Sequence, residues 1–536
     1  MLANKQLVAT NKQLFLTNKE LIDICDKSNK YIVDTVMSIC VPITKEEMSN
    51  HYGINNCDEI ATKYGLNIQD NFPFANCPVS AFKLEKSKIS IFAVSLAYLV
   101  IAKSEDKTID KEILLNRLLN TIIVTGIKNK DNSPDCFSWP VDISIEGSTS
   151  SGTSNQTCIA LSTLLRAGFL KQNQAMEYDV LKKRYELVIR ALRWLIKNQN
   201  RDGSWTYGEM CVDINETSID YAVLPSHYCY ENIRKYIDFF NSPNGSNEIA
   251  GTVGPKIIDE MHDACKRFEN WVEGAMEEPG GFYLSNLHRE HLSPLHTCLC
   301  HIIYFYNYDV SRLDLTKFMK TTGYVFENFK MLRSAISKGK NSTEEYRYKY
   351  ETKDGVPDYK DDKYEIVTEF LYITYSTRLL KSNYAWYLDN KQKKQLKILN
   401  YYSYRSLLGK LGEMNSDGKN LFVYRGDDNA REYPIYGLYD AQVCLLELLK
   451  SKNDRGEIPI LYSPLKERAL QATQIGILVV LLAIVVRGFV RIIAQMFEMD
   501  ENATVICLLG GMITGLITGI VTGTICDYLG KTNSKK

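Results

Sequence analysis

Histidine and cysteine side chains gather in one short stretch of this chain, HREHLSPLHTCLCH. Four of the seven histidines lie within these 14 residues, which end at His301. Imidazole and thiolate groups are the usual protein ligands of zinc. His296 and Cys300 are four residues apart and would share a helix face, so we consider a zinc site built from His291, His296 and Cys300. The alternative is a packed histidine cluster without a metal, which the irregular spacing and Pro294 favour.

Acidic side chains form two further groups. Asp361, Asp362 and Glu365 have the loose pattern DDxxE, and paired carboxylates of this kind can hold magnesium. Their lysine-rich surroundings indicate a solvated loop instead. Arg425, Asp427, Asp428 and Arg431 crowd one turn, which is a second candidate site or a surface ion-pair cluster. We expect no cofactor, with zinc or magnesium as the weaker alternative.

Other charged and aromatic side chains lie in turns beside predicted buried helices. They could line the mouth of a binding site, where tyrosine rings can bind a cation or an aromatic ligand. Tyrosines in a helical core are the simpler explanation for many of them. The candidate mouth residues are Asp142, Glu146, Asp213, Glu216, Asp220, Tyr221, Arg289, Glu290, Arg425, Asp427, Asp428 and Arg431.

Helices of two alternating kinds must position these residues. One kind is apolar nearly all round and should be buried, as in KISIFAVSLAYLVIA and DAQVCLLELLK. The other kind is amphipathic with a charged outer face, as in LKKRYELVIRALRWLIKNQ. Six of each, at a spacing of about 65 to 75 residues, predict an all-α fold: an (α/α)6 toroid of six helical hairpins. An open solenoid of helical pairs is the alternative.

One motif resembles a known family. NQNRDGSW, with Gln199, Gly203 and Trp205, is similar to the Gln–Trp repeat of squalene and hopene cyclases, and SGTSNQTCIALSTLLRAG is similar to an inner helix of such a repeat. The resemblance implies the toroid shared by terpenoid cyclases and protein prenyltransferases. The acid motif DxDD of protonation-initiated cyclases is absent from the sequence, and the zinc pattern of prenyltransferases is not matched.

Two apolar segments of about 23 residues, Ile475–Phe497 and Ala503–Ile525, follow this region. A helix of that length reaches about 35 Å, which is enough to cross a bilayer. The sequence therefore predicts a two-helix transmembrane hairpin. Arg487 and Arg491 lie one turn apart within the first segment, and the second carries a ladder of glycines that would let helices approach closely. The ladder consists of Gly511, Gly515, Gly519 and Gly523.

Charge and cysteine usage indicate the compartment. Basic residues flank the hairpin on its outer sides while the turn inside it is acidic, so the toroid and both termini are expected in the cytoplasm beneath the inner membrane. The 14 cysteines are scattered and expected to be reduced. With 64 basic and 64 acidic side chains, nucleic acid is not an expected partner.

Together these features predict five regions and three functions. The regions are a heptad-like helix (1–19), the toroid (20–455), a linker (456–473), the hairpin (474–528) and a basic tail (529–536). The first function is a toroid that senses a small-molecule, lipid or protein ligand and controls an oligomerising, membrane-disrupting hairpin that contacts membrane lipid, a layout like that of anti-phage defence effectors. A membrane-bound isoprenoid enzyme and a constitutive binding scaffold are the alternatives.

Overall fold

The computed structural model describes most of the predicted toroid and little of the C-terminal region. The described residues are 18–78, 88–105, 108–129, 132–145, 147, 149–172, 176–206, 223–245, 248–254, 256–283, 292–307, 310–337, 367–411 and 435–455, with scattered residues between 473 and 491. Contacts divide the chain into two units, Met1–Tyr462 and Ser463–Lys536.

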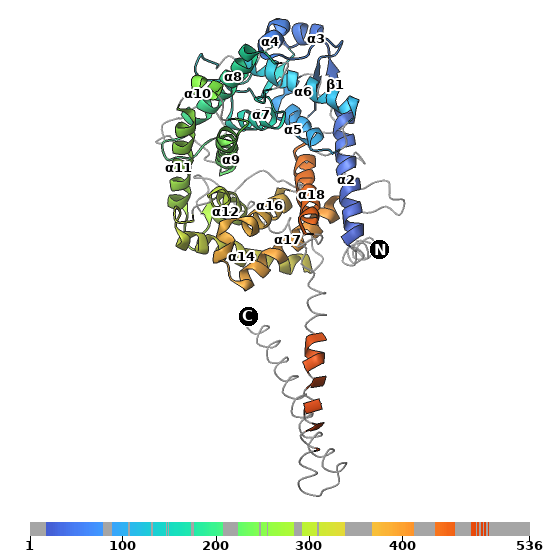
Figure 1. The fold of residues 1–536 in the computed structure, drawn as a ribbon, viewed down its shortest axis with the longest axis vertical. Coiled ribbons are helices and arrows are strands. Elements are labelled where there is room, and N and C mark those ends of the chain that lie inside the picture. Colours follow the sequence, from blue (N-terminus) through green and yellow to red (C-terminus); the bar gives the residue numbers. More distant parts are fainter. Residues whose placement is uncertain are drawn as a thin grey trace, which may run out of the picture. The chain divides into compact units, whose positions relative to one another are not determined.

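The first unit is built of helices in two layers (Figure 1). The outer helices are α2 (Asn18–Ile39), α6 (Ile109–Ile127), α8 (Tyr178–Lys197), α11 (Ile257–Ala275), α14 (Leu315–Ser337) and α17 (Asn390–Leu411). The inner helices are α5 (Ile91–Ala102), α7 (Ser154–Arg166), α9 (Val223–Asn241), α12 (Pro294–Cys300) with α13 (Ile302–Tyr306), α16 (Val367–Lys381) and α18 (Ile435–Arg455).

The inner helices contact one another in a closed cycle. The cycle runs α5, α7, α9, α12, α16, α18 and returns to α5. Gln442 of α18 closes it by donating a hydrogen bond of 2.9 Å to the carbonyl oxygen of Val100 in α5. The predicted alternation of inner and outer helices is confirmed, and the described residues form a helical ring rather than an open solenoid.

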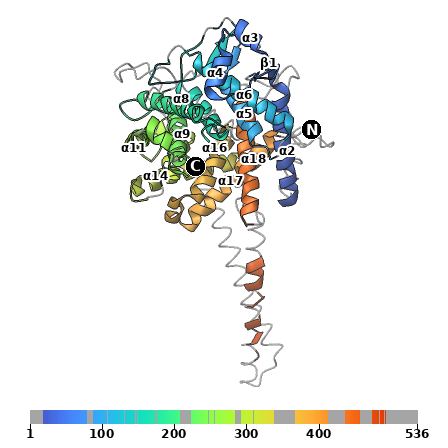
Figure 2. The same ribbon diagram turned by 45° about the horizontal axis from the view of Figure 1, so that its top comes forward.

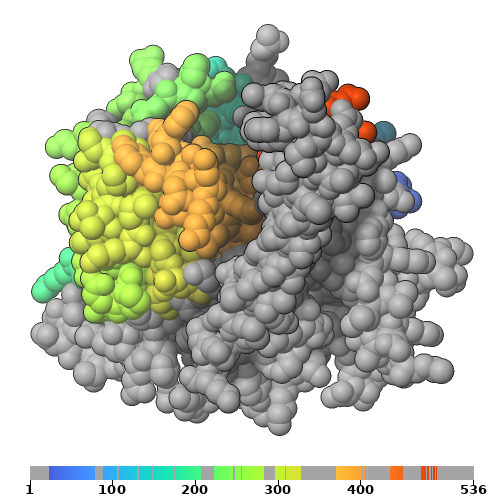
Figure 3. Space-filling view, turned by 90° about the horizontal axis from the view of Figure 1, so that it is seen from below, coloured from blue at the N-terminus to red at the C-terminus, as the bar shows by residue number. Residues whose placement is uncertain are grey.

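The inner helices are apolar because neighbours surround them. In α5, ten of the twelve residues are buried, since the helix packs against α6 outside and against α7 and α18 at its sides. Polar side chains define where such helices begin: the hydroxyls of Ser90 and Thr153 accept hydrogen bonds from the first turns of α5 and α7. Figure 2 shows the two layers from a second direction, and Figure 3 shows α14 (yellow) and α17 (orange) packed side by side.

Short elements lie between the long helices. These are α3 (Lys45–Asn50), α4 (Cys57–Tyr64), α10 (Glu248–Val253) and the 3-10 helix η2 (Asn383–Tyr387). Three antiparallel strand pairs join segments near the helix ends: β1 (Val41–Ile43) with β2 (Phe74–Asn76), β3 (Lys88–Ser90) with β4 (Asp142–Ser144), and β5 (Phe282–Tyr283) with β6 (Leu292–Ser293).

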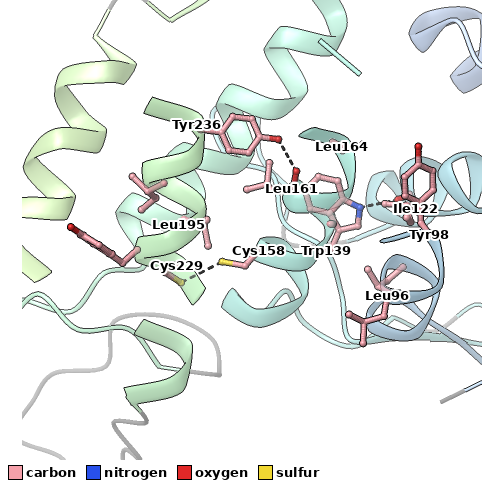
Figure 4. Close-up of a cluster of buried hydrophobic side chains, with 14 of the residues drawn as sticks. Leu96, Tyr98, Ile122, Trp139, Cys158, Leu161, Leu164, Leu195, Cys229 and Tyr236 are labelled. Carbon is pink, nitrogen blue, oxygen red and sulfur yellow. Dashed lines mark hydrogen bonds between the residues drawn. The ribbon is translucent and has the colours of Figure 1, made fainter. Parts of the chain in front are cut away.

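An aromatic residue follows several outer helices and ties them to the next inner helix. The indole N–H groups of Trp139 and Trp205 each donate a hydrogen bond of 2.8 Å back to the outer helix they follow. Their backbone N–H groups donate to hydroxyls on the next inner helix, Thr157 in α7 and Ser226 in α9. Figure 4 shows Trp139 in the core, near the thiols of Cys158 and Cys229, whose sulfur atoms are 3.6 Å apart. Each tryptophan therefore links an outer helix to the next inner helix through the same two hydrogen bonds.

The C-terminal predictions have a different outcome. In the parts of the chain that the structure describes, no helix combines the length and the apolar composition needed to cross a membrane. This finding contradicts the predicted multi-pass inner-membrane location with a cytoplasmic toroid. Arg487 and Arg491 occupy exposed helical positions, while the glycine ladder from Gly511 to Gly523 lies outside the described residues.

Candidate functional site

Glu231 of α9 is the centre of one group of charged side chains in the inner ring. Its carboxylate is 2.9 Å from a guanidinium nitrogen of Arg378 in α16 and 3.3 Å from the amine of Lys235 one turn away. Tyr306 donates its hydroxyl to the same carboxylate at 3.2 Å. In the ring, α12 separates α9 from α16, so the Glu231–Arg378 pair joins helices that are not neighbours.

These side chains differ in their access to solvent. The side chain of Glu231 is 9% exposed, whereas those of Arg378 and Lys235 are 35% and 39% exposed. The carboxylate is thus covered by its own partners, and the cations keep open surface. A ligand that reached this place would meet the cations first.

The ionisation of Glu231 is governed by those partners. Burial acts to raise the pKa of its carboxyl, but the charges of Lys235 and Arg378 outweigh burial and hold the pKa well below its usual range. For Arg378, burial acts to lower the pKa of the guanidinium, but the negative charge of Glu231 outweighs burial and the pKa is raised. Glu231 and Arg378 are therefore both charged at neutral pH.

His227 adds a neutral hydrogen-bonding group to this place. Burial lowers the pKa of His227 to about 4, so its ring is neutral at pH 7. The Nδ1 atom is 3.1 Å from the carbonyl oxygen of Leu299, which can only accept, so Nδ1 carries the ring proton. The Nε2 atom, 3.9 Å from the Glu231 carboxylate, is then a free acceptor on this tautomer.

Two more cations extend the cluster toward α5 and α7. Lys103, which ends α5, places its amine 3.9 Å from the centre of the Tyr439 ring of α18. Arg166 ends α7 and donates to the carbonyl oxygen of Ala102 at 2.8 Å. Neither forms an ion pair with another described residue. We call the set Lys103, Arg166, His227, Glu231, Lys235, Arg378, Tyr439 and Asp440 the inner-ring charge cluster.

Positive charge exceeds negative charge in this cluster. The described members comprise three cations, Arg166, Lys235 and Arg378, and the two carboxylates of Glu231 and Asp440, with Lys103 as a fourth basic group whose pKa burial lowers to about 7, so the surplus at neutral pH is between one and two positive charges. In a ring of low polarity, such a surplus attracts anions strongly.

A second buried carboxylate, Glu269 of α11, is held by partners from neighbouring segments. It accepts hydrogen bonds from Tyr230 at 2.8 Å and Asn307 at 3.1 Å, and pairs with Arg312 at 2.9 Å. Its side chain is 2% exposed. Its contacts with Tyr230 and Asn307 join α11 to α9 and to the end of α13, while Arg312 is 36% exposed and so keeps open surface as Arg378 does.

The predicted mouth residues lie mostly outside the described part of the chain. Asp142 is described: it sits in β4 with its side chain 3.5 Å from the amine of Lys88, so it pairs across the strand ladder. The predicted residues beyond the described ranges are Glu146, Asp213, Glu216, Asp220, Tyr221, Arg289, Glu290, Arg425, Asp427, Asp428 and Arg431, together with Asp361, Asp362 and Glu365.

The candidate zinc ligands divide in the same way. His291 is outside the described residues, while His296 and Cys300 both lie in α12. Burial lowers the pKa of His296 to about 4 and raises the pKa of the Cys300 thiol, which opposes the thiolate that zinc requires. In the described part of the chain, no three histidine, cysteine or acidic side chains meet in a way that could hold a metal ion.

The inner-ring charge cluster was missed by sequence reasoning, although a signal for it exists. His227, Glu231 and Lys235 are spaced by four residues and so share one face of a helix most of whose residues are buried. Arg378 is likewise a charge within an inner helix. A charged stripe on a buried helix needs partners from other helices, which only the fold can supply.

Comparison with known proteins corrects the expected family. No protein-family model and no curated protein matches the chain. Among solved structures, a GH76 α-mannanase of Bacteroides thetaiotaomicron, determined as its selenomethionine derivative, is similar over 77% of this chain and 99% of its own, at 11% identity and a TM-score of 0.37. The expected relation to terpenoid cyclases and prenyltransferases is therefore wrong: the structure that matches is a glycoside hydrolase. At this TM-score, the likeness supports no conclusion about the chemistry of this chain.

Proposed function

We propose that this protein is a receptor for a small anionic ligand, which binds at the inner-ring charge cluster. The surplus of positive charge beside the covered Glu231 carboxylate is the observation that carries the proposal. An anionic group would contact Arg166, Lys103 and the open faces of Lys235 and Arg378. The neutral Nε2 of His227 would accept a hydrogen bond from a ligand hydroxyl.

Such a ligand would join helices from separate hairpins. Lys103 is on α5, Arg166 on α7, Lys235 on α9 and Arg378 on α16. One ligand that bridges these helices would favour one arrangement of the ring over others, and binding would shift that equilibrium by its difference in affinity. This coupling supports a sensing function.

The test uses the full chain and inorganic pyrophosphate as the probe. Thermal unfolding and calorimetric titration would be measured in pyrophosphate and in sodium chloride of equal ionic strength. We expect pyrophosphate to raise the melting temperature, and Arg166→Gln to weaken binding about tenfold, which corresponds to about 1.4 kcal/mol. Lys63→Gln, on the distant outer face of α4, is the matched control. Equal responses of the Arg166→Gln variant and the wild type would refute the site.

A second proposal concerns the C-terminal unit: we propose that it joins copies of this chain. Ile475, Leu478, Leu481 and Val485 are helical and their exposed fractions are 60%, 68%, 56% and 66%. Apolar surface of this kind is favourably covered by another copy of the same segment. Light scattering after gel filtration should show an oligomer for the full chain and a smaller species for Leu478→Glu with Leu481→Glu. Gly476→Ala is the control, and unchanged mass of the double variant would contradict the proposal.

A further inference from the structure

Lys103 has an unusual position for a lysine. It is the C-cap residue of α5, and its amine lies over the ring of Tyr439 at 3.9 Å from the ring centre. It is partly exposed, and among the described residues it forms no ion pair. A lysine at the protein surface would normally project into water. This one is directed between two inner helices.

Hydrogen bonds from two other helices fix the end of α5 that carries this amine. Arg166 of α7 donates to the carbonyl oxygen of Ala102, the residue before Lys103. Gln442 of α18 donates to the carbonyl oxygen of Val100. Because α7 and α18 flank α5 in the ring, the backbone at Lys103 is held from both sides. The backbone from which this side chain extends is therefore fixed, and the amine lies over the Tyr439 ring.

The groups that face the amine are mainly positive. They are Lys235 of α9, Arg166 of α7 and Lys450 of α18, opposed by Asp440 of α18. Burial first, and the charge of Lys235 second, lower the pKa of Lys103 to about 7. Desolvation together with an adjacent cation is the arrangement that makes a lysine amine nucleophilic at neutral pH.

We propose that Lys103 Nζ forms a reversible imine with an anionic aldehyde or ketone, the carboxylate of which is bound by Arg166 and Lys235. This inference rests on the proposed anion site and assigns its ligand to the oxo acids. The neutral amine adds to the carbonyl carbon to give a carbinolamine. Loss of the remaining N–H proton and departure of the oxygen as water then form the C=N bond. The step consumes neither oxidant nor reductant, and hydrolysis reverses it.

The test traps the imine on the full chain. The protein is incubated with glyoxylate, reduced with borohydride to fix the adduct as a secondary amine, digested and analysed by mass spectrometry. We expect the adduct on the peptide that contains Lys103, and at least tenfold less total labelling in Lys103→Arg, which keeps the charge and lacks a neutral amine. Lys63→Arg is the matched control, because Lys63 also lies over a tyrosine ring, that of Tyr64, but on an outer segment.

The pH dependence gives a second measurement. Labelling at Lys103 should rise as pH increases through about 7, since the amine loses its proton there, and Lys235→Gln should shift that rise to higher pH by removing a neighbouring positive charge. Labelling spread evenly over surface lysines, or unchanged in Lys103→Arg, would overturn the inference. If pyrophosphate still binds to both the wild type and Lys103→Arg in that case, the anion site is retained and only the imine is refuted. Loss of both signals would refute both proposals.

Discussion

The carboxylate of Glu231 and the guanidinium of Arg378 are 2.9 Å apart although 147 residues separate them in the chain. The two helices that carry them are not neighbours in the ring, since α12 lies between them. The pair therefore links non-adjacent hairpins on the inner side of the ring. It is both a structural tie and the centre of the charged group that we assign to ligand binding.

Arg378→Met should destabilise the protein, because it leaves a covered carboxylate with Lys235 as its remaining cation. Loss of one partner from a buried pair costs about 3–5 kcal/mol, and the remaining lysine and the partial exposure of Arg378 should reduce this to about 2–3 kcal/mol. Glu231→Gln with Arg378→Met should recover much of the loss. Urea unfolding measures both. Lys45→Met, which breaks the exposed pair with Asp58, should cost less than about 1 kcal/mol. Equal losses in both single variants would contradict the buried character of the pair.

His301 should make stability depend on pH. Its ring is 1% exposed, packed against Tyr304, Phe318 and Tyr375, and burial lowers its pKa to about 3. An unfolded histidine has a pKa of about 6.5, so the unfolded chain binds the extra proton between these values. The contribution is complete above about pH 6.5 and falls below it by up to about 1.4 kcal/mol per pH unit.

Urea unfolding at pH 7, 6 and 5 measures this slope. His301→Phe, which suits the surrounding aromatic rings, should flatten it by up to about 1.4 kcal/mol per unit. His51→Phe, at an exposed position, is the control and should leave the slope unchanged. A slope that is the same in both variants would show that His301 contributes little to the pH dependence.

Gly203 should tolerate no side chain. Its φ is +100°, and a Cβ atom there would lie 2.3 Å from the carbonyl oxygen of Arg267 in α11. Both the left-handed conformation and the contact with rigid backbone oppose alanine, so Gly203→Ala should destabilise by about 2 kcal/mol or more. Gly274→Ala, in an open position of α11, should instead stabilise by up to about 1 kcal/mol. Thermal unfolding compares the two, and similar melting temperatures would refute the close approach.

Gln199 should stabilise the contact between α8 and α11. Its amide donates to the carbonyl oxygens of Gly203 at 2.8 Å and Ala264 at 2.9 Å, and accepts from Arg267 at 2.8 Å. Gln199→Ala removes three hydrogen bonds, two of them to buried carbonyl oxygens, and should cost about 2–3 kcal/mol. Gln392→Ala, which removes a hydrogen bond to the exposed backbone of Asp389, is the control. If both cost the same in urea unfolding, the bridge contributes little.

The repeated helices could be predicted from the sequence, because their physical cause is local. A helix such as α5 is apolar on every face, and one such as α8 has a single apolar face, so composition and period reveal which layer each occupies. Gln199, Gly203 and Trp205 similarly marked a turn that needs glycine and an aromatic plug. The family drawn from those residues was wrong, because such packing motifs determine how hairpins stack and do not determine chemistry.

Ring closure and the charge cluster were decided by the tertiary structure. Nothing local in α5 or α18 specifies that Gln442 reaches Val100, since the two lie at opposite ends of the ring domain and meet only when all hairpins have stacked. Glu231, Arg378, Lys103 and Arg166 are each ordinary in sequence. Their shared electrostatics arise from distances between helices far apart in the chain, and a Coulomb interaction depends on separation in space rather than separation in sequence.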